Sequence, residues 1–163
     1  MPRPTHPYLR TRQGWLYLAV VLDLATRRVV GWCTGSTLGE ELVLDALQRA
    51  LTSRRPAPGW CQHSDRGSQY AGRAHRDAVT AHGGTLSMSR RGNCYDNAVV
   101  ESFFATLKVE LGEALEWEDA HAAQRDLFEF IEVWYNRQRR HSTLGYVSPV
   151  AYEESLVRQA NAV

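Results

Sequence analysis

Runs of apolar residues and helically spaced apolar stripes alternate along this chain. The run of valine, leucine and aromatic residues at 14–24 predicts a strand buried on both faces, and the run at 29–35 predicts a second strand that pairs back on it. A shorter stretch at 6–11 predicts another strand before them. Two more short strands are expected at 60–63 and 85–89.

Helical periodicity appears between and after these strands. Helices are predicted at 40–53, 70–82, 97–111 and 117–140, and a last one begins at Pro149. Thr37 and Glu40 have the spacing of a capping box at the start of the first helix. In the long fourth helix, an inner face is predicted from four apolar residues, Leu127, Phe130, Ile131 and Trp134.

This order of strands and helices is typical of a layered α/β domain with a mixed sheet. With 163 residues, 44% of them hydrophobic, the chain suits one core domain, assigned to residues 1–155, with a C-terminal tail at 156–163. The given sequence has no apolar run of signal-peptide or membrane-span length. Its three cysteines, Cys33, Cys61 and Cys94, are far apart, which argues against zinc or disulfides and fits a reducing cytosol.

The charge is unevenly distributed along the chain. Residues 110–132 hold eight acids and one base, so the remaining 18 bases exceed the remaining 10 acids by eight. All of the bases except Lys108 are arginines, whose planar guanidinium binds phosphate well. The distribution is compatible with a nucleic-acid-binding face, although scattered surface arginines alone do not establish one.

Two carboxylates have a spacing that is relevant to metal binding. Asp65 follows a predicted strand, and Glu101 lies in a predicted helix, with 35 residues between them. On that helix Glu101 and Lys108 share a face that is not the apolar stripe, so Glu101 is not expected in the core. A carboxylate followed by a cation could hold a metal and a phosphate, but such a pair is usually only solvated surface.

Four segments in this order resemble the integrase core of OrfB-type bacterial insertion-sequence transposases. They are residues 17–32 (YLAVVLDLATRRVVGW), 63–70 (HSDRGSQY), 90–110 (RRGNCYDNAVVESFFATLKVE) and 134–153 (WYNRQRRHSTLGYVSPVAYE). These proteins belong to the DDE superfamily, which also contains the retroviral integrases. The resemblance extends over most of the chain, from about Thr5 to Glu153.

The resemblance implies a ribonuclease H-like fold with a five-stranded mixed sheet flanked by helices, here with a truncated or degenerate first strand. It also implies DNA transposition or integration, in which three carboxylates hold two Mg²⁺ or Mn²⁺ ions for strand cleavage and transfer. Asp65 matches the second catalytic and metal-binding acid, Glu101 matches the third, and Lys108 matches a DNA-contacting lysine.

The position of the first acid departs from the family pattern. Thr5 stands where the family motif has aspartate, and Pro7 stands where it has threonine, whereas Tyr8 and Thr11 match. The chain is therefore expected to keep the fold and to be impaired in catalysis. One interpretation is an inactivated remnant that restarts at Met1 without the helix-turn-helix region that usually precedes the core.

Two other interpretations remain open. His6 or Asp23 could substitute for the first acid, although the ordinary role of Asp23 would be to fix a hairpin turn, with Arg27 or Arg28 as a possible partner. Alternatively, Asp65 and Glu101 could bind metal weakly by themselves, or the domain could act in a complex with other chains.

Further DNA contacts are expected at two places. The loop and helix start at 90–97 offers Arg90, Arg91, Asn93, Tyr95 and Asn97, with an ordinary polar loop as the alternative. The helix end at 137–140 offers Arg137, Arg139 and Arg140, which would also favour the helix dipole.

Three histidines and four tryptophans are not expected to take part in the site. His75, His82 and His121 are interpreted as surface residues, and Trp15, Trp32, Trp60 and Trp134 as core or near-core aromatics. The resemblance further implies a bacterial cytoplasmic protein that binds DNA and forms homo-oligomers or assembles with other transposase chains, and no contact with membranes is expected. The alternative function is a non-catalytic DNA-binding or oligomerising transposase remnant.

Overall fold

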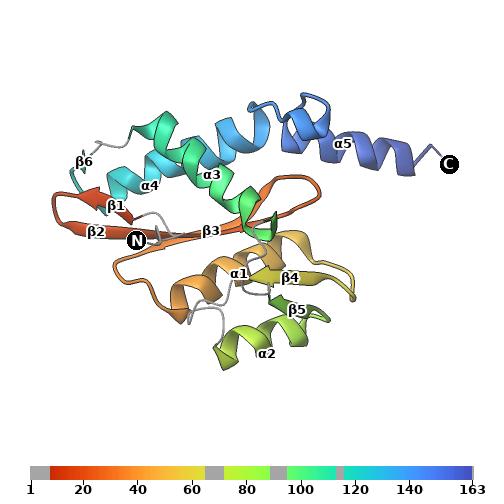
Figure 1. Cartoon of the computed structure of the whole chain (residues 1–163), viewed down its shortest axis with the longest axis horizontal. Coiled ribbons are helices and arrows are strands. Elements are labelled where there is room, and N and C mark those ends of the chain that lie inside the picture. Colours follow the sequence, from red (N-terminus) through yellow and green to blue (C-terminus); the bar gives the residue numbers. More distant parts are fainter. Residues whose placement is uncertain (1–7, 65–71, 89–94, 113–115, 163) are drawn as a thin grey trace.

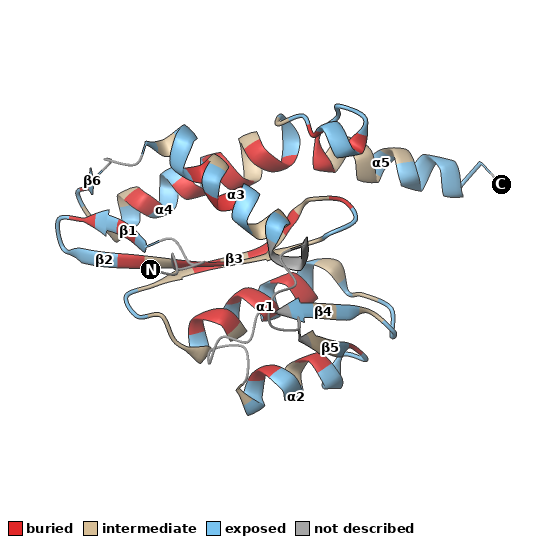
Figure 2. Ribbon diagram, viewed as in Figure 1, coloured by how far each residue is buried: buried red, intermediate tan, exposed pale blue. Residues whose placement is uncertain are grey.

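A computed structural model describes residues 8–64, 72–88, 95–112 and 116–162 of the chain (Figure 1). A sheet lies between two layers of helix, with α1 (Glu40–Arg54) on one side and α3 (Tyr95–Leu111) and α4 (Ala120–Phe128) on the other. Buried positions of α3 and α4, and Leu42, Val43 and Ala46 of α1, pack against residues of the sheet (Figure 2). The predicted mixed α/β architecture is confirmed.

Three consecutive strands form an antiparallel meander. They are β1 (Tyr8–Thr11), β2 (Gly14–Leu22) and β3 (Val29–Gly35), and Tyr8 pairs with Tyr17 while Ala19 pairs with Cys33. The short strand β6 (Glu116–Trp117) pairs in parallel with the far edge of β1 and gives the order β3-β2-β1-β6.

The two remaining strands form a parallel pair. They are β4 (Cys61–Ser64) and β5 (Thr85–Met88), and α2 (Arg73–Ala81) connects them. All five strands expected from the sequence are therefore present, and β6 is an addition. Within the described ranges, β4 and β5 pair with each other and with no other strand.

Helix α1 (Glu40–Arg54) packs directly on β3. Its buried residues recur at helical spacing, as predicted, and are Leu42, Val43, Ala46, Leu47, Ala50 and Leu51. Gly31 permits the close approach, because a Cβ at that position would lie 2.7 Å from the backbone nitrogen of Ala50. The predicted capping box is wrong: Gly39 is the N-cap, and no side chain caps this helix.

Helices α3 (Tyr95–Leu111) and α4 (Ala120–Phe128) cover the other face of the sheet. Their apolar stripes join residues of the sheet in the largest core cluster, which includes Leu18, Phe103, Leu107, Leu127 and Ile131. Phe103 is fully buried, and its ring lies 4.9 Å from the ring of Tyr135. Burial of this aromatic centre fixes α3 against the sheet.

The long fourth helix changes its winding in the middle. After α4, the π-helix η1 (Glu129–Tyr135) begins, and in such a helix residues five apart lie on one face. Phe130 and Tyr135 are both buried, as are Ile131 and Asn136. The predicted α-helical inner face placed Trp134 inside, but Trp134 is half-buried at the margin of the core, and Tyr135 and Asn136 occupy the interior.

The chain ends in a short 3-10 turn, η2 (Ser142–Leu144), and helix α5 (Pro149–Ala160), which extends away from the body (Figure 1). The predicted start of α5 is confirmed, since Ser148 accepts a hydrogen bond from the Ala151 nitrogen and Pro149 is in the first turn. Helix α5 crosses the expected boundary between residues 155 and 156 without a break.

Candidate functional site

Helix α3 holds Glu101 and Lys108 at the protein surface. Both side chains are exposed, whereas Phe103, Phe104 and Leu107 between them are buried. The prediction that Glu101 is not a core residue is therefore confirmed. Because seven residues make almost two full turns, Glu101 and Lys108 project from the same flank of α3.

The second predicted acid, Asp65, is the residue that follows β4. This strand ends at Ser64, and Asp65 itself lies outside the described residues. The same holds for Thr5, Arg90, Arg91 and Asn93. Tyr95 and Asn97 lie in the first turn of α3, but their side chains are outside the described set.

The donor chemistry of the two predicted acids suits a hard divalent cation, because Mg²⁺ and Mn²⁺ prefer carboxylate oxygens. The Glu101 carboxylate is exposed and forms no ion pair with another residue in the part of the chain that the structure describes, so it is available as a ligand. Among the described residues, no group of three or more His, Cys, Asp or Glu side chains could hold a metal.

Asp23 fixes the β2–β3 turn, as its interpretation as a structural residue predicts. Its Oδ1 accepts hydrogen bonds from the backbone nitrogens of Ala25 at 2.9 Å and Thr26 at 3.2 Å. Its ion-pair partner is Arg54, at 3.5 Å, in place of the expected Arg27 or Arg28. These contacts employ both oxygens of the Asp23 carboxylate within the protein.

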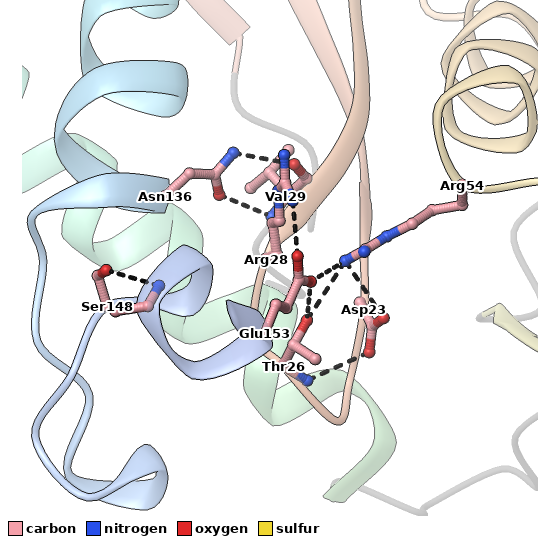
Figure 3. Close-up of polar contacts among 9 residues, drawn as sticks. Asp23, Thr26, Arg28, Val29, Arg54, Asn136, Ser148 and Glu153 are labelled. Atoms are coloured by element: carbon pink, nitrogen blue, oxygen red, sulfur yellow. Dashed lines mark hydrogen bonds and ion pairs between the residues drawn. The ribbon is translucent and has the colours of Figure 1, made fainter. Parts of the chain in front are cut away.

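Glu153 is the centre of a polar cluster that sequence reasoning missed (Figure 3). From α5 its carboxylate accepts hydrogen bonds from Thr26 at 2.8 Å and Arg28 at 2.6 Å, and it also pairs with Arg54. One acid thus joins the last helix to the β2–β3 turn and to the end of α1. The partners are separated by about a hundred residues or more, so only their tertiary arrangement reveals the cluster.

We expect Glu153→Gln to lower the free energy of unfolding by roughly 2 kcal/mol at pH 7, because it leaves two arginines without their carboxylate. Burial would raise the pKa of Glu153, but hydrogen bonds from Arg54, Arg28 and Thr26 outweigh it and lower that pKa below 4.5. A lowered folded-state pKa gives stability that is present above 4.5 and is lost as the pH falls through the folded value.

Urea unfolding at pH 7 and pH 3 measures this effect. The difference between the parent and Glu153→Gln should shrink at pH 3. The neighbouring Glu154 is exposed, so Glu154→Gln is the matched control. An equal loss for both variants, or a loss from Glu153→Gln that does not depend on pH, would contradict a role for the ionised Glu153 carboxylate.

The three arginines at the end of η1 differ in their surroundings. Arg137 and Arg140 are exposed, which leaves their guanidinium groups available to a ligand. Arg139 is half-buried and lies 5.5 Å from the centroid of the Tyr135 ring. Its Nη2 donates to Thr106 Oγ1 at 3.3 Å, and its Nη1 is 3.0 Å from Nδ1 of His141.

Two buried histidines were not predicted to be buried. His75 was interpreted as a surface residue, but it is fully buried, and this burial lowers its pKa, with Glu40 opposing the shift. His141 is also buried, and burial together with Arg139 and Arg27 lowers its pKa to about 4. The imidazole of His141 is therefore neutral at pH 7 and can accept a hydrogen bond from Arg139.

The tryptophans follow the expectation only in part. Trp32, Trp60 and Trp134 are half-buried, whereas Trp15 is 51% exposed and is not a core residue. Cys33 is buried, and Cys61 is exposed. No helix in the described parts of the chain combines the length and apolar character needed to cross a membrane.

Comparison with protein families gives two matches, both described as "Integrase core domain". One covers residues 5–94 and the other residues 82–149. The first match includes Asp65, and the second includes Glu101 and Lys108.

Curated relatives are encoded by bacterial insertion sequences. The 31 kDa protein of insertion element IS600 from Shigella sonnei is 45% identical over 94% of this chain and 56% of its own length. The IS904 transposase of Lactococcus lactis is 42% identical over 90% of this chain and 58% of its own. Transposase InsF of IS3A from Escherichia coli K12 is 44% identical over 90% and 51%. The chain thus spans about half the length of these relatives.

Solved structures with the same fold are retroviral integrases. A chain of the simian T-cell lymphotropic virus intasome, determined in complex with the PP2A regulatory subunit B56 gamma, aligns over 83% of this chain and 48% of its own, with a TM-score of 0.64 and 14% identity. The HTLV-2 integrase catalytic core, determined with magnesium, covers 87% of this chain and 88% of its own, with a TM-score of 0.62 and 12% identity. The predicted ribonuclease H-like fold is confirmed.

Proposed function

Because this chain belongs to the integrase core family of bacterial insertion-sequence transposases, we propose that it is a transposase core for metal-dependent cleavage and transfer of DNA strands. The observation that carries the proposal is the exposed flank of α3. It presents the Glu101 carboxylate and the Lys108 ammonium to solvent, although Phe103, Phe104 and Leu107 between them are buried.

Asp65 and Glu101 are the proposed catalytic and metal-binding residues. Mg²⁺ or Mn²⁺, two ions in an active site, would supply Lewis acidity to the attacking and leaving oxygens when bound. Glu101 contributes a negative ligand from a rigid helix. Lys108, on the same flank, would bind a DNA phosphate and orient the strand toward these carboxylates.

The proposed DNA-binding surface includes other residues near the start of α3 and the end of η1. They are Arg90, Arg91, Asn93, Tyr95, Asn97, Arg137 and Arg140. Arginines would bind phosphate, the asparagines would reach sugars or bases, and Tyr95 would stack. The exposure of Arg137 and Arg140 supports their part in this surface.

We propose that catalysis is impaired, since Thr5 occupies the place of the first acid and provides no negative charge. A site with two carboxylates would bind two dications weakly and would hold the nucleophile in a poorly defined position. The alternative is a non-catalytic module that binds DNA or joins other transposase chains. DNA, a second copy of the chain or another transposase chain in a bacterial cytoplasm are the proposed partners.

Calorimetric titration of the protein with Mn²⁺ tests this function without knowledge of the DNA sequence. We expect weak binding that is lost in Glu101→Gln, because the substitution removes one of two charged ligands. Glu110→Gln, which changes an exposed acid near the end of the same helix, should leave the binding unchanged. Equal Mn²⁺ binding by the parent and Glu101→Gln would instead support the non-catalytic alternative.

A further inference from the structure

Arg139 lies between the end of η1 and helix α3. On one side is the end of η1, which is fixed to the sheet because Asn136 exchanges two hydrogen bonds of 3.0 Å with the backbone of Val29. On the other side is α3, where Thr106 Oγ1 accepts the hydrogen bond from Arg139. Arg139 therefore connects the sheet-bound segment to the helix that carries Glu101.

The position of Thr106 on α3 is important. Phe103, Phe104 and Leu107 define the buried side of the helix, and residues on its two flanks lie about 110° to either side by helical geometry. Thr106 is on one flank, and Glu101 and Lys108 are on the other. A contact at Thr106 therefore resists rotation of α3 about its own axis and so fixes the direction of the Glu101 flank.

The surroundings of Arg139 favour this internal role over contact with phosphate. Its guanidinium is next to the Tyr135 ring, the neutral His141 ring and Thr106, and the Tyr135 and His141 rings are 5.2 Å apart. Tyr135 in turn contacts Phe103 of α3. Arg137 and Arg140, by contrast, are exposed and form no side-chain hydrogen bond or ion pair within the described residues.

We propose that Arg139 is a positioning residue that sets the rotation of α3, and thereby the place of Glu101 and Lys108, through its hydrogen bond to Thr106. The inference rests on the proposed function, because it concerns the metal-binding carboxylate of that site. Side-chain tips lie about 5–6 Å from a helix axis, so a rotation of roughly 10° moves the Glu101 carboxylate by about 1 Å. Such a displacement is enough to impair a metal-dependent reaction.

Amide hydrogen exchange in α3 tests the contact without any activity. Thr106→Val and Arg139→Met should each speed exchange in α3 several-fold, and the double variant should be no faster than Arg139→Met alone, because Arg139→Met already removes the hydrogen bond to Thr106. Thr106→Ser retains the hydroxyl and should exchange like the parent. Gln138→Ala, at an exposed neighbouring position, is the control. Additive effects of the two substitutions would overturn the proposal.

The second measurement is Mn²⁺ affinity in the Thr5→Asp protein, which supplies the missing acid. Arg139→Met should weaken the affinity about tenfold if Glu101 is displaced by roughly 1 Å, and Thr106→Ser should retain it. Val43→Ala shortens a core residue of α1 and controls for a simple loss of stability. Unchanged Mn²⁺ affinity in Arg139→Met would overturn the positioning role.

DNA binding separates this role from a phosphate contact. The salt dependence of binding to a labelled duplex should keep its slope in Arg139→Met, whereas loss of a phosphate contact lowers the slope by about 0.9. A lowered slope with normal metal affinity would assign Arg139 to the DNA surface. If the Thr5→Asp protein binds no Mn²⁺ at all, the proposed function fails, and the hydrogen-exchange cycle still decides whether Arg139 fixes α3.

Discussion

Asn136→Leu is expected to lower the free energy of unfolding by about 3–4 kcal/mol, although the leucine and asparagine side chains have the same number of heavy atoms and the same branching. Asn136 is buried, and its amide oxygen accepts from the Val29 nitrogen while its amide nitrogen donates to the Val29 oxygen. β3 is at the edge of the described sheet, so this side chain replaces a neighbouring strand at Val29. Leucine would leave two buried backbone groups unpaired, at about 1–3 kcal/mol each.

Thermal and urea unfolding measure this loss, which corresponds to a fall in Tm of roughly 10 °C for a domain of this size. Asn161→Leu, at an exposed position, is the control and should have little effect. Asn136→Asp can still accept from the Val29 nitrogen but cannot donate when ionised, so it should be least stable near neutral pH relative to the parent. A loss no greater than that of Asn161→Leu would show that the Asn136 amide does not support β3.

The strands and helices could be predicted because burial repeats along the sequence. The continuous apolar run of β2 and the spacing from Leu42 to Leu51 in α1 report local backbone geometry directly. The start of α5 was also predicted, since Ser148 and Pro149 act within the first turn. The capping box predicted from Thr37 and Glu40 is absent because it requires Thr37 to be the N-cap. Helix α1 begins two residues later, after Gly39.

The polar contacts that join distant segments could not be predicted in the same way. Glu153 contacts Thr26, Arg28 and Arg54, and no sequence spacing connects the end of the chain with a turn near its beginning. The π-helix was not predicted because its turns are wider, with hydrogen bonds between residues five apart, and a helical period of 3.6 does not detect them. The wider turn places Asn136 in the interior beside Val29.

The sequence predicted which residue types the candidate site contains better than it predicted which of them lie together in space. The offset of seven residues on an amphipathic helix correctly predicted that Glu101 and Lys108 share an exposed flank of α3. The pairing of Glu101 with Asp65 came from the family resemblance, and it remains a prediction because Asp65 lies outside the described residues. The internal contacts of Arg139 could not be read from a cluster of three arginines at a helix end.

Thr5→Asp is expected to raise the affinity for Mn²⁺ by tenfold or more, and it is the largest functional gain predicted for a single substitution. The new carboxylate would add a negative ligand to a site that otherwise has Asp65 and Glu101. A unit charge 4 Å from another contributes up to about 4 kcal/mol near a protein surface, so a net gain of 1.4 kcal/mol, or tenfold, is a modest fraction of that attraction. Calorimetric titration with Mn²⁺ and Mg²⁺ measures it.

Two variants identify the origin of this gain. Thr5→Asn adds an amide oxygen without negative charge and should recover only a small part of the affinity. The double variant with Thr5→Asp and Glu101→Gln should lose most of the gain, because the carboxylates act on the same ions and their effects are not additive. If Thr5→Asp binds metal no better than the parent, and the parent binding depends on Glu101, another residue already supplies the first acid. The impairment assigned to Thr5 would then be wrong, while the role of Glu101 would stand.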